Sequence, residues 1–130
     1  MRCSMANTDC PTEYQEQCKI IAWSRLMVAT NQEPRLKLLR AGMEGLRLSM
    51  GVRVKAKKAG MDGAWPDLTL FIANKGFHAL LIELKRLKGG TVSKEQAEMI
   101  GILQEQGYAA CVCKGAAHAI KVIKEYLDIL

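Results

Sequence analysis

Three charged residues stand where two apolar segments would otherwise form ordinary buried strands. Asp67 precedes the segment LTLFIA, and Glu83 and Lys85 fall inside LLIELKRL. Charged side chains are rarely buried unless they are paired or bound to a metal. Two carboxylates held close together can bind a divalent cation such as Mg²⁺, which takes hard oxygen ligands and also contacts substrate phosphates. One chemistry that this spacing suits is therefore metal-dependent reaction at a phosphate.

The loop between the two segments decides whether these charges meet. Residues 74–76 are Asn-Lys-Gly, and both Asn and Gly tolerate the positive φ of a tight hairpin. A three-residue loop predicts the opposed pairs Ala73–Phe77, Leu70–Leu80, Leu68–Ile82 and Asp67–Glu83. Because strand side chains alternate, Glu83 and Lys85 would then share a face with Asp67. A two-residue loop would instead move Asp67 to the opposite face.

Two explanations remain open for this cluster of charges. Opposed carboxylates repel each other and destabilise a sheet, so something must offset that cost. A divalent cation held by Asp67 and Glu83 would do so. Lys85 would also do so, as the partner of one carboxylate in an ion pair at a strand end.

The composition is that of a globular protein that favours anionic partners. The chain of 130 residues suffices for one domain, and its net charge of +6 favours contact with anions such as nucleic acid. No apolar run reaches the ~18 residues of a membrane span, and the first residues lack the apolar core of a secretory signal. The five cysteines form no CxxC pair and only two histidines accompany them. We therefore expect a cytoplasmic protein with reduced thiols and neither a zinc site nor disulfides.

Four helices and three strands are predicted, in the order ααββαβα. Thr12 with Gln15, and Ser93 with Gln96, form capping boxes that begin two of the helices. The predicted helices cover residues 13–28, 49–59, 93–106 and 117–130, and the predicted strands cover 68–73, 77–84 and 108–113. This order predicts a mixed α/β (α+β) domain over residues 12–130, with a small sheet flanked by helices and a loose tail at residues 1–11.

Two helical side chains could join the charged cluster. Glu16 lies one turn before Ile20 and so points with the apolar stripe of the first helix, whereas Glu13 lies nearer the edge of that stripe. A favourable interaction with the helix dipole also explains a Glu at this place. Gln96 precedes two apolar residues by four and seven positions and could face the sheet, although its capping box explains it equally well.

Residues 35–58 are strongly basic. The cations are Arg35, Lys37, Arg40, Arg47, Arg53, Lys55, Lys57 and Lys58, and the only acid among them is Glu44. Such a run is usually a solvated face. This large excess of basic over acidic residues also favours contact with DNA phosphates. The helix in this segment is expected to turn three residues inward, namely Val52, Ala56 and Ala59.

The motifs of the chain resemble those of the virus-type replication-repair nuclease (VRR-NUC) domain. Pro66-Asp67 followed by Glu83-Leu84-Lys85 is similar to the PD-(D/E)xK nuclease signature. The wider resemblance covers roughly residues 12–127, and its pieces are EYQEQ, PRLKLL, GLRLS, PDL, IELKR, SKEQ and GYAACVCKGAAHAI. It implies a restriction-endonuclease-like core in a compact stand-alone protein of the type found in phages and prophages.

The resemblance also implies a Mg²⁺- or Mn²⁺-dependent DNA endonuclease. Asp67, Glu83 and the backbone carbonyl of Leu84 would be metal ligands. Glu16 would complete the metal site from the first helix, with Glu13 as the weaker candidate.

The remaining functional residues follow from the same resemblance. Lys85 would orient the attacking water or stabilise the transition state, and Gln96 would position that water or Lys85. These two would be catalytic together with Asp67 and Glu83. We expect DNA contacts from Arg47, Arg53, Lys55, Lys57 and Lys58.

Branched DNA such as a four-way (Holliday) junction is the substrate that the resemblance implies, cut by a homodimer. Two departures from the family pattern concern Trp65, where a small or β-branched residue is usual, and residues 41–45, which replace a Pro-Asn-Gly-Gly run. The alternative is a catalytically silent DNA-binding protein with the same fold. No motif for an organic cofactor is present.

Overall fold

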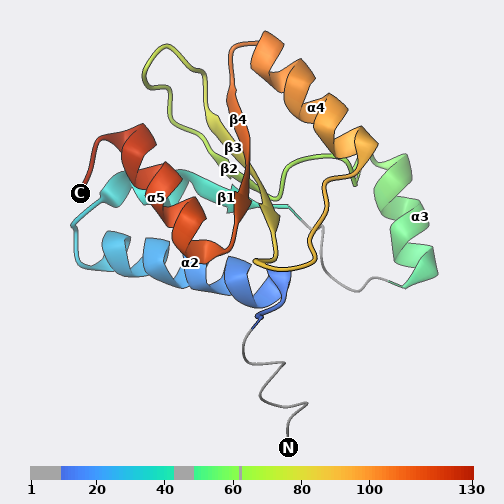
Figure 1. Ribbon diagram of the computed structural model, residues 1–130, viewed down its shortest axis with the longest axis horizontal. Coiled ribbons are helices and arrows are strands. Elements are labelled where there is room, and N and C mark those ends of the chain that lie inside the picture. Colours follow the sequence, from blue (N-terminus) through green and yellow to red (C-terminus); the bar gives the residue numbers. More distant parts are fainter. Residues whose placement is uncertain (1–9, 43–48, 62) are drawn as a thin grey trace, which may run out of the picture.

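A four-stranded sheet in the order β1-β2-β3-β4 separates two layers of helix in this computed structural model (Figure 1). The structure describes residues 10–42, 49–61 and 63–130. The helices are α2 (Glu13–Ala29), the 3₁₀ helix η1 (Pro34–Leu38), α3 (Met50–Lys58), α4 (Lys94–Glu105) and α5 (Ala116–Leu127). The strands are β1 (Leu39–Ala41), β2 (Leu68–Leu70), β3 (Leu80–Lys85) and β4 (Ala109–Lys114).

The sheet is mixed, which confirms the predicted α+β class. The β1–β2 and β2–β3 pairs are antiparallel, whereas β3 and β4 are parallel and are joined by a crossover through α4. The sequence analysis missed η1 and β1, which occupy the first part of the basic segment. A strand of three residues is too short to display an alternating pattern.

The two faces of the sheet bury different apolar sets. One face packs against α2 and α5, and its strand residues are Leu39, Leu68, Leu70, Leu80, Ile82, Leu84 and Cys113. The other face packs against α4 through Leu81 and Ala110. Because side chains alternate along β3, Glu83 and Lys85 lie on the α4 side.

The β2–β3 hairpin combines two registers. Its tip is a two-residue turn with φ of 53° at Lys75 and 83° at Gly76, so Asn74 pairs with Phe77 and the predicted Ala73–Phe77 pair is wrong. The predicted pairs Leu70–Leu80 and Leu68–Ile82 are nevertheless confirmed. Residues 71–73 oppose only residues 78–79, and this one extra residue returns the base of the hairpin to the predicted register. The turn residues set the pairing register at the tip, whereas burial of apolar side chains sets the register at the base.

Side chains protect the two outer edges of the sheet. On β4, Gln104 Nε2 donates to the Ala110 carbonyl at 2.9 Å, and the Lys114 N–H donates to His118 Nδ1 at 3.1 Å. On β1, the Arg40 guanidinium donates to nearby backbone carbonyls. Exposed edge groups invite pairing with other chains, and these bonds restrict it.

The helix predictions hold for α2, α4 and α5 and fail in part for α3. Both predicted capping boxes form, at Thr12 and at Ser93. Within α3 no residue is buried, and Val52 is 45% exposed. The predicted inward face of Val52, Ala56 and Ala59 is therefore wrong, because α3 lies at the periphery, away from the sheet (Figure 1).

The described cysteines form no disulfide. Cys10, Cys18, Cys111 and Cys113 are free, and Cys3 lies outside the described residues. None of the described helices is long and apolar enough to cross a membrane. The Arg86 guanidinium binds the carbonyls of Cys10 and Pro11, so the last residues of the expected tail contact the strand end.

Candidate active site

Asp67 and Glu83 face each other at the base of the β2–β3 hairpin. The paired register of the two strands, extended by one residue, sets them opposite. Asp67 Oδ2 accepts a hydrogen bond of 2.7 Å from the Leu84 N–H, which fixes this carboxylate against β3. The hairpin thus brings together the two carboxylates that the sequence predicted to meet.

The Glu83 carboxylate is buried and only partly compensated. It is 3% exposed, and its Oε1 accepts from Gln96 Nε2 at 2.8 Å and lies 3.4 Å from Lys85 Nζ. Burial raises the pKa of Glu83 to about 7; the negative charges of Asp67 and Glu13 add to this shift, and Lys85 opposes it. The contacts from Gln96 and Lys85 are both to Oε1. A cation or a proton would relieve this site.

Gln96 has two structural roles at once. Its Oε1 accepts from the Ser93 N–H at 3.0 Å and completes the capping box of α4, while its Nε2 donates to Glu83. An amide can do both because its oxygen accepts and its nitrogen donates. The two explanations that the sequence left open are therefore both correct.

Glu16 binds the start of α5, where the Gly115 N–H donates to the Lys85 carbonyl at the end of β3. It is 3% exposed; its Oε2 accepts from the Ala116 N–H at 3.2 Å and its Oε1 lies 3.2 Å from Lys19 Nζ. The N-cap of α5 is Gly115, which offers no side chain, so the Glu16 carboxylate satisfies the helix terminus instead. Gly115 has φ 82°, and a Cβ there would approach Glu16 Oε2 to 2.7 Å, so this contact requires glycine.

Among the described residues, Asp67 and Glu83 form a pair of carboxylates that is not part of a larger cluster of metal-ligating side chains. Among described residues, no group of three or more His, Cys, Asp and Glu side chains is arranged to hold an ion. Asp67 and Glu83 are close enough to affect each other electrostatically, and Glu13, not Glu16, adds to the shift of Glu83. Glu13, in the first turn of α2, makes the smallest of these contributions to the raised pKa of Glu83.

The donor set of this pair suits a hard divalent cation. Mg²⁺ is commonly held by one or two carboxylates, with water and substrate phosphate completing its shell. Asp67 and Glu83 supply the carboxylates. The third predicted ligand is the backbone carbonyl of Leu84, the residue between Glu83 and Lys85 in the sequence. Burial and the negative charge of Asp67 both disfavour the ionised form of Glu83 and raise its pKa, and a cation held by the two carboxylates would offset this cost.

Lys114 joins this face of the sheet and was not predicted. It pairs with Lys85 in the parallel β3–β4 register, so the two side chains leave the same face on adjacent strands. Lys85 is buried against Glu83, whereas Lys114 is exposed. Lys114 directly follows the predicted strand 108–113, and only the parallel register, which the sequence did not predict, sets it beside Lys85.

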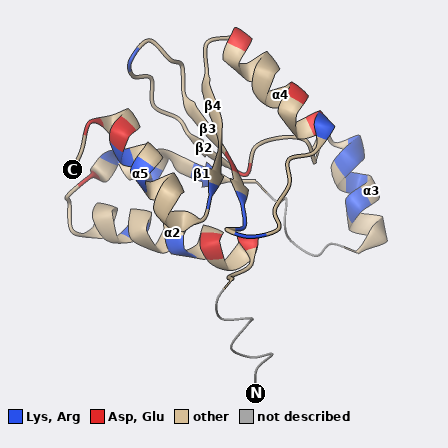
Figure 2. Ribbon diagram, in the orientation of Figure 1, with Lys and Arg blue, Asp and Glu red and all other residues tan. Residues whose placement is uncertain are grey.

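The predicted DNA-binding residues divide into three groups. Four of the basic residues lie on α3, and all four are exposed: Arg53, Lys55, Lys57 and Lys58 (Figure 2). Arg47 lies outside the described residues. Arg35 instead pairs with the buried Glu33 through two side-chain bonds, and its guanidinium holds the pKa of Glu33 below the ordinary value.

Comparison with known proteins decides the family. The VRR-NUC domain profile matches residues 4–117. The chain belongs to the VRR-NUC domain family. A solved structure described as a "VRR_NUC domain protein" is 28% identical, with a TM-score of 0.75, and the match covers 92% of this chain and 90% of that chain. No curated protein matches the sequence.

Membership of the VRR-NUC family indicates the kind of chemistry in which the paired carboxylates can act. The VRR-NUC domain is a nuclease domain, so this chain carries the fold of an enzyme that cleaves DNA. The hairpin of this VRR-NUC domain holds Asp67, Glu83 and Lys85, and α4 adds Gln96. These are the groups from which its chemistry can be argued.

Proposed function

We propose that this VRR-NUC protein is a metal-dependent, structure-selective DNA endonuclease that hydrolyses phosphodiester bonds in branched DNA such as four-way junctions. The observation that carries the proposal is the buried Glu83 carboxylate, raised in pKa, opposite Asp67 and bonded to both Lys85 and Gln96. A repulsive carboxylate pair destabilises the sheet, and a bound cation offsets that cost.

Asp67 and Glu83, with the Leu84 carbonyl, would hold Mg²⁺ or Mn²⁺. The bound ion would supply Lewis acidity and an activated water at the scissile phosphate. Asp67 is kept in place by the Leu84 N–H, and Glu83 by Gln96. The Lys85 ammonium, held beside Glu83 Oε1, would orient the attacking water or stabilise charge on the phosphate.

Glu16 remains a candidate ligand whose position argues for a supporting role. Its carboxylate contacts the N-terminus of α5 and Lys19, and it would have to leave those partners to reach an ion. Glu13 is the acid whose charge already acts on Glu83. We therefore place Glu13 before Glu16 as the helical group that assists the metal.

Exposed cations of α3 and β4 would bind the DNA backbone beside the Asp67–Glu83 pair. The exposed cations of α3 have no described ionic partner and suit salt-sensitive, largely sequence-independent phosphate contacts. Lys114, beside Lys85, would hold a phosphate next to the scissile one, because two adjacent ammonium groups are stabilised by a shared anion.

Four-way junctions have two-fold symmetry, and a homodimer would place two active sites on two strands. We propose this assembly for a chain whose matched domain fills most of its length. Phage or prophage origin and an intracellular setting would accord with such a role.

The test is cleavage of labelled four-way junction, flap and linear duplex DNA with Mg²⁺, with Mn²⁺ and with chelator. Asp67→Asn is the matched variant, since an amide oxygen still accepts from the Leu84 N–H while the charge is lost. Lys121→Ala, an exposed cation on α5, is the control. We expect metal-dependent cutting that Asp67→Asn abolishes and Lys121→Ala leaves intact. Tight, salt-sensitive binding without cutting would instead support the catalytically silent DNA-binding protein.

A further inference from the structure

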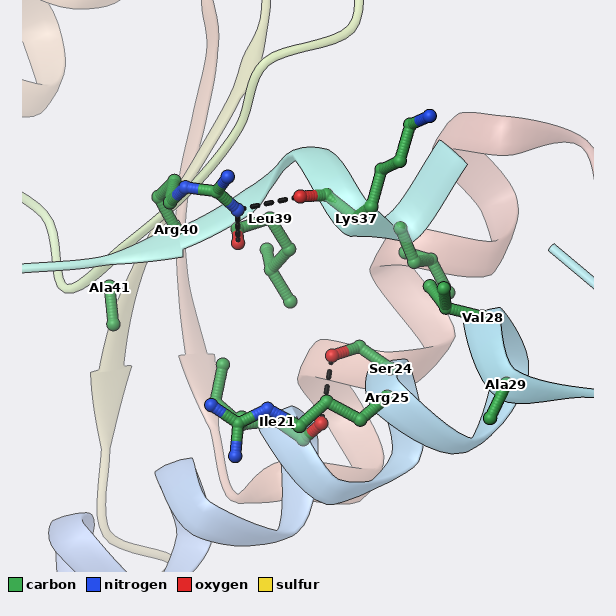
Figure 3. Close-up of a pocket in the computed structure, with 10 residues that line it drawn as sticks. Ile21, Ser24, Arg25, Val28, Ala29, Lys37, Leu39, Arg40 and Ala41 are labelled. Atoms are coloured by element: carbon green, nitrogen blue, oxygen red, sulfur yellow. Dashed lines mark hydrogen bonds between the residues drawn. The ribbon is translucent and has the colours of Figure 1, made fainter. Parts of the chain in front are cut away.

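A hollow between α2 and the η1–β1 segment combines an apolar floor with a cationic rim (Figure 3). Its volume of about 570 Å³ falls within the range of small-ligand sites. The floor includes Ile21, Val28 and Leu39, and the rim carries Arg25, Lys37 and Arg40. In Figure 3 the Arg25 and Arg40 side chains lie on opposite sides of the hollow, while Lys37 extends outward beyond it.

No described acidic residue neutralises the rim charges. None of the described lining residues is acidic. Arg25 and Lys37 make no side-chain hydrogen bond or ion pair with any described residue, and Arg40 contacts only backbone carbonyls. A second hollow, beside α4, is lined by Glu95 and Glu98 and by no described cation. Charge complementarity therefore assigns an anion to the hollow of α2 and β1.

This hollow adjoins the candidate active site through the backbone. Ala41 lies at one end of it, and the N–H of the next residue, Gly42, donates to the Asp67 carbonyl at 3.0 Å. Because Asp67 faces the α4 side of the sheet and the hollow lies on the α2 side, a DNA strand bound at Asp67 would reach the hollow around the β1 edge of the sheet.

We propose that this hollow binds one unpaired nucleotide of the DNA substrate beside the cleaved bond. Arg25 and Arg40 would hold its phosphate, and Ile21, Val28 and Leu39 would contact its base. A base inside a duplex is stacked and would leave the floor empty, whereas an unpaired base exposes its faces at little unstacking cost. The inference rests on the proposed function and adds that the substrate carries an unpaired nucleotide at the branch.

A binding assay tests this subsite without requiring cleavage. Fluorescence anisotropy in chelator would compare a blunt duplex with the same duplex bearing a short oligothymidine extension. We expect Arg25→Glu to lower affinity for the extended DNA about tenfold more than affinity for the blunt duplex. Lys121→Glu makes the same charge change on α5 and should weaken both DNAs alike. Equal loss for both DNAs in Arg25→Glu would overturn the subsite.

Methyl NMR locates the bound nucleotide independently of affinity. Ala29 and Ala41 line the hollow, and Ala117 is exposed on α5. On adding oligothymidine to the alanine-labelled protein, we expect the Ala29 and Ala41 methyl signals to shift and the Ala117 signal to stay. Unshifted Ala29 and Ala41 signals at saturating DNA would refute the proposal.

The two proposals fail in distinguishable ways. If the wild type cuts branched DNA but the extension preference survives in Arg25→Glu, the subsite is wrong and the nuclease stands. If oligothymidine shifts Ala29 and Ala41 but no DNA is cut with any metal, the subsite stands and the proposed function is wrong.

Discussion

Helices α2 and α4 begin with the same local motif and use it differently. Thr12–Gln15 and Ser93–Gln96 both form capping boxes, and their N-cap residues have the same φ of −71° and ψ of 162°. The Gln15 amide caps α2, whereas Gln96 also donates to the buried Glu83 carboxylate. Identical local geometry can therefore serve stability alone in one place and support a reactive carboxylate in another, depending on what packs beside it.

Among variants of the two partners of Glu83 Oε1, Lys85→Ala should have the largest effect, because Lys85 carries the compensating charge. We expect cleavage to fall by about 10²–10³-fold, the usual consequence of losing a charged group that stabilises the transition state. Single-turnover cleavage of junction DNA, with Lys121→Ala alongside, measures this. A loss no greater than that of Lys121→Ala would make Lys85 a structural partner only.

The most direct test of the difference between α4 and α2 is to compare Gln96→Glu with Gln15→Glu. Glu at the third helical position still completes a capping box, so both variants should keep their helices. Gln96→Glu removes the N–H₂ donor and sets a carboxylate against Glu83, and we expect cleavage to fall about 10- to 100-fold. Circular dichroism melting and cleavage, measured on both variants, decide the matter. Equal activities would mean that Gln96, like Gln15, is a cap and nothing more.

The pH dependence of stability should distinguish the surroundings of α4 from those of α2. The folded-state pKa of Glu83 is raised to about 7 from an ordinary 4.5, so its stability contribution is present below about 4.5 and is lost as pH rises through 7. Between pH 5 and pH 8, the metal-free wild type should lose on the order of 1–2 kcal/mol relative to Glu83→Gln, allowing for solvent screening. Urea titrations at both pH values measure the change. A difference that does not vary with pH contradicts the raised pKa.

Gln15→Ala should have the smallest effect. It removes the acceptor for the Thr12 N–H, and we expect the free energy of unfolding to fall by about 0.5–1 kcal/mol with cleavage unchanged. Denaturant unfolding and cleavage at a temperature well below the transition check this. If a stably folded Gln15→Ala protein lost cleavage, Gln15 would also be needed for activity and would not differ from Gln96 in this respect.

The sequence predicted those parts of the site that local rules control. Capping boxes need only four residues, and both formed as expected. Alternating apolar residues fixed the register at the base of the hairpin, so Asp67 and Glu83 were correctly placed together although the predicted turn was wrong. Burial of Leu68 and Leu70 outweighs the geometry of an exposed tip.

The remaining features depend on contacts between distant segments. Lys114 stands beside Lys85 only because β4 pairs parallel to β3, and a parallel pairing leaves no turn in the sequence to reveal its register. The hollow lined by Arg25 and Arg40 exists because η1 and β1 pack over α2, and neither element was visible in the sequence. The exposure of α3 could not be predicted, since an amphipathic pattern does not show whether a partner is present.

The contact between Glu16 and Ala116 has a consequence for how the protein is made. The two residues are 100 positions apart, so the buried carboxylate of the first long helix finds its donor only after the last helix has been synthesised. Likewise β3 gains its second neighbour only with β4. A chain in which β4 and α5 have not yet been synthesised therefore lacks the contacts that hold α2 and β3, the strand of Glu83 and Lys85, in place.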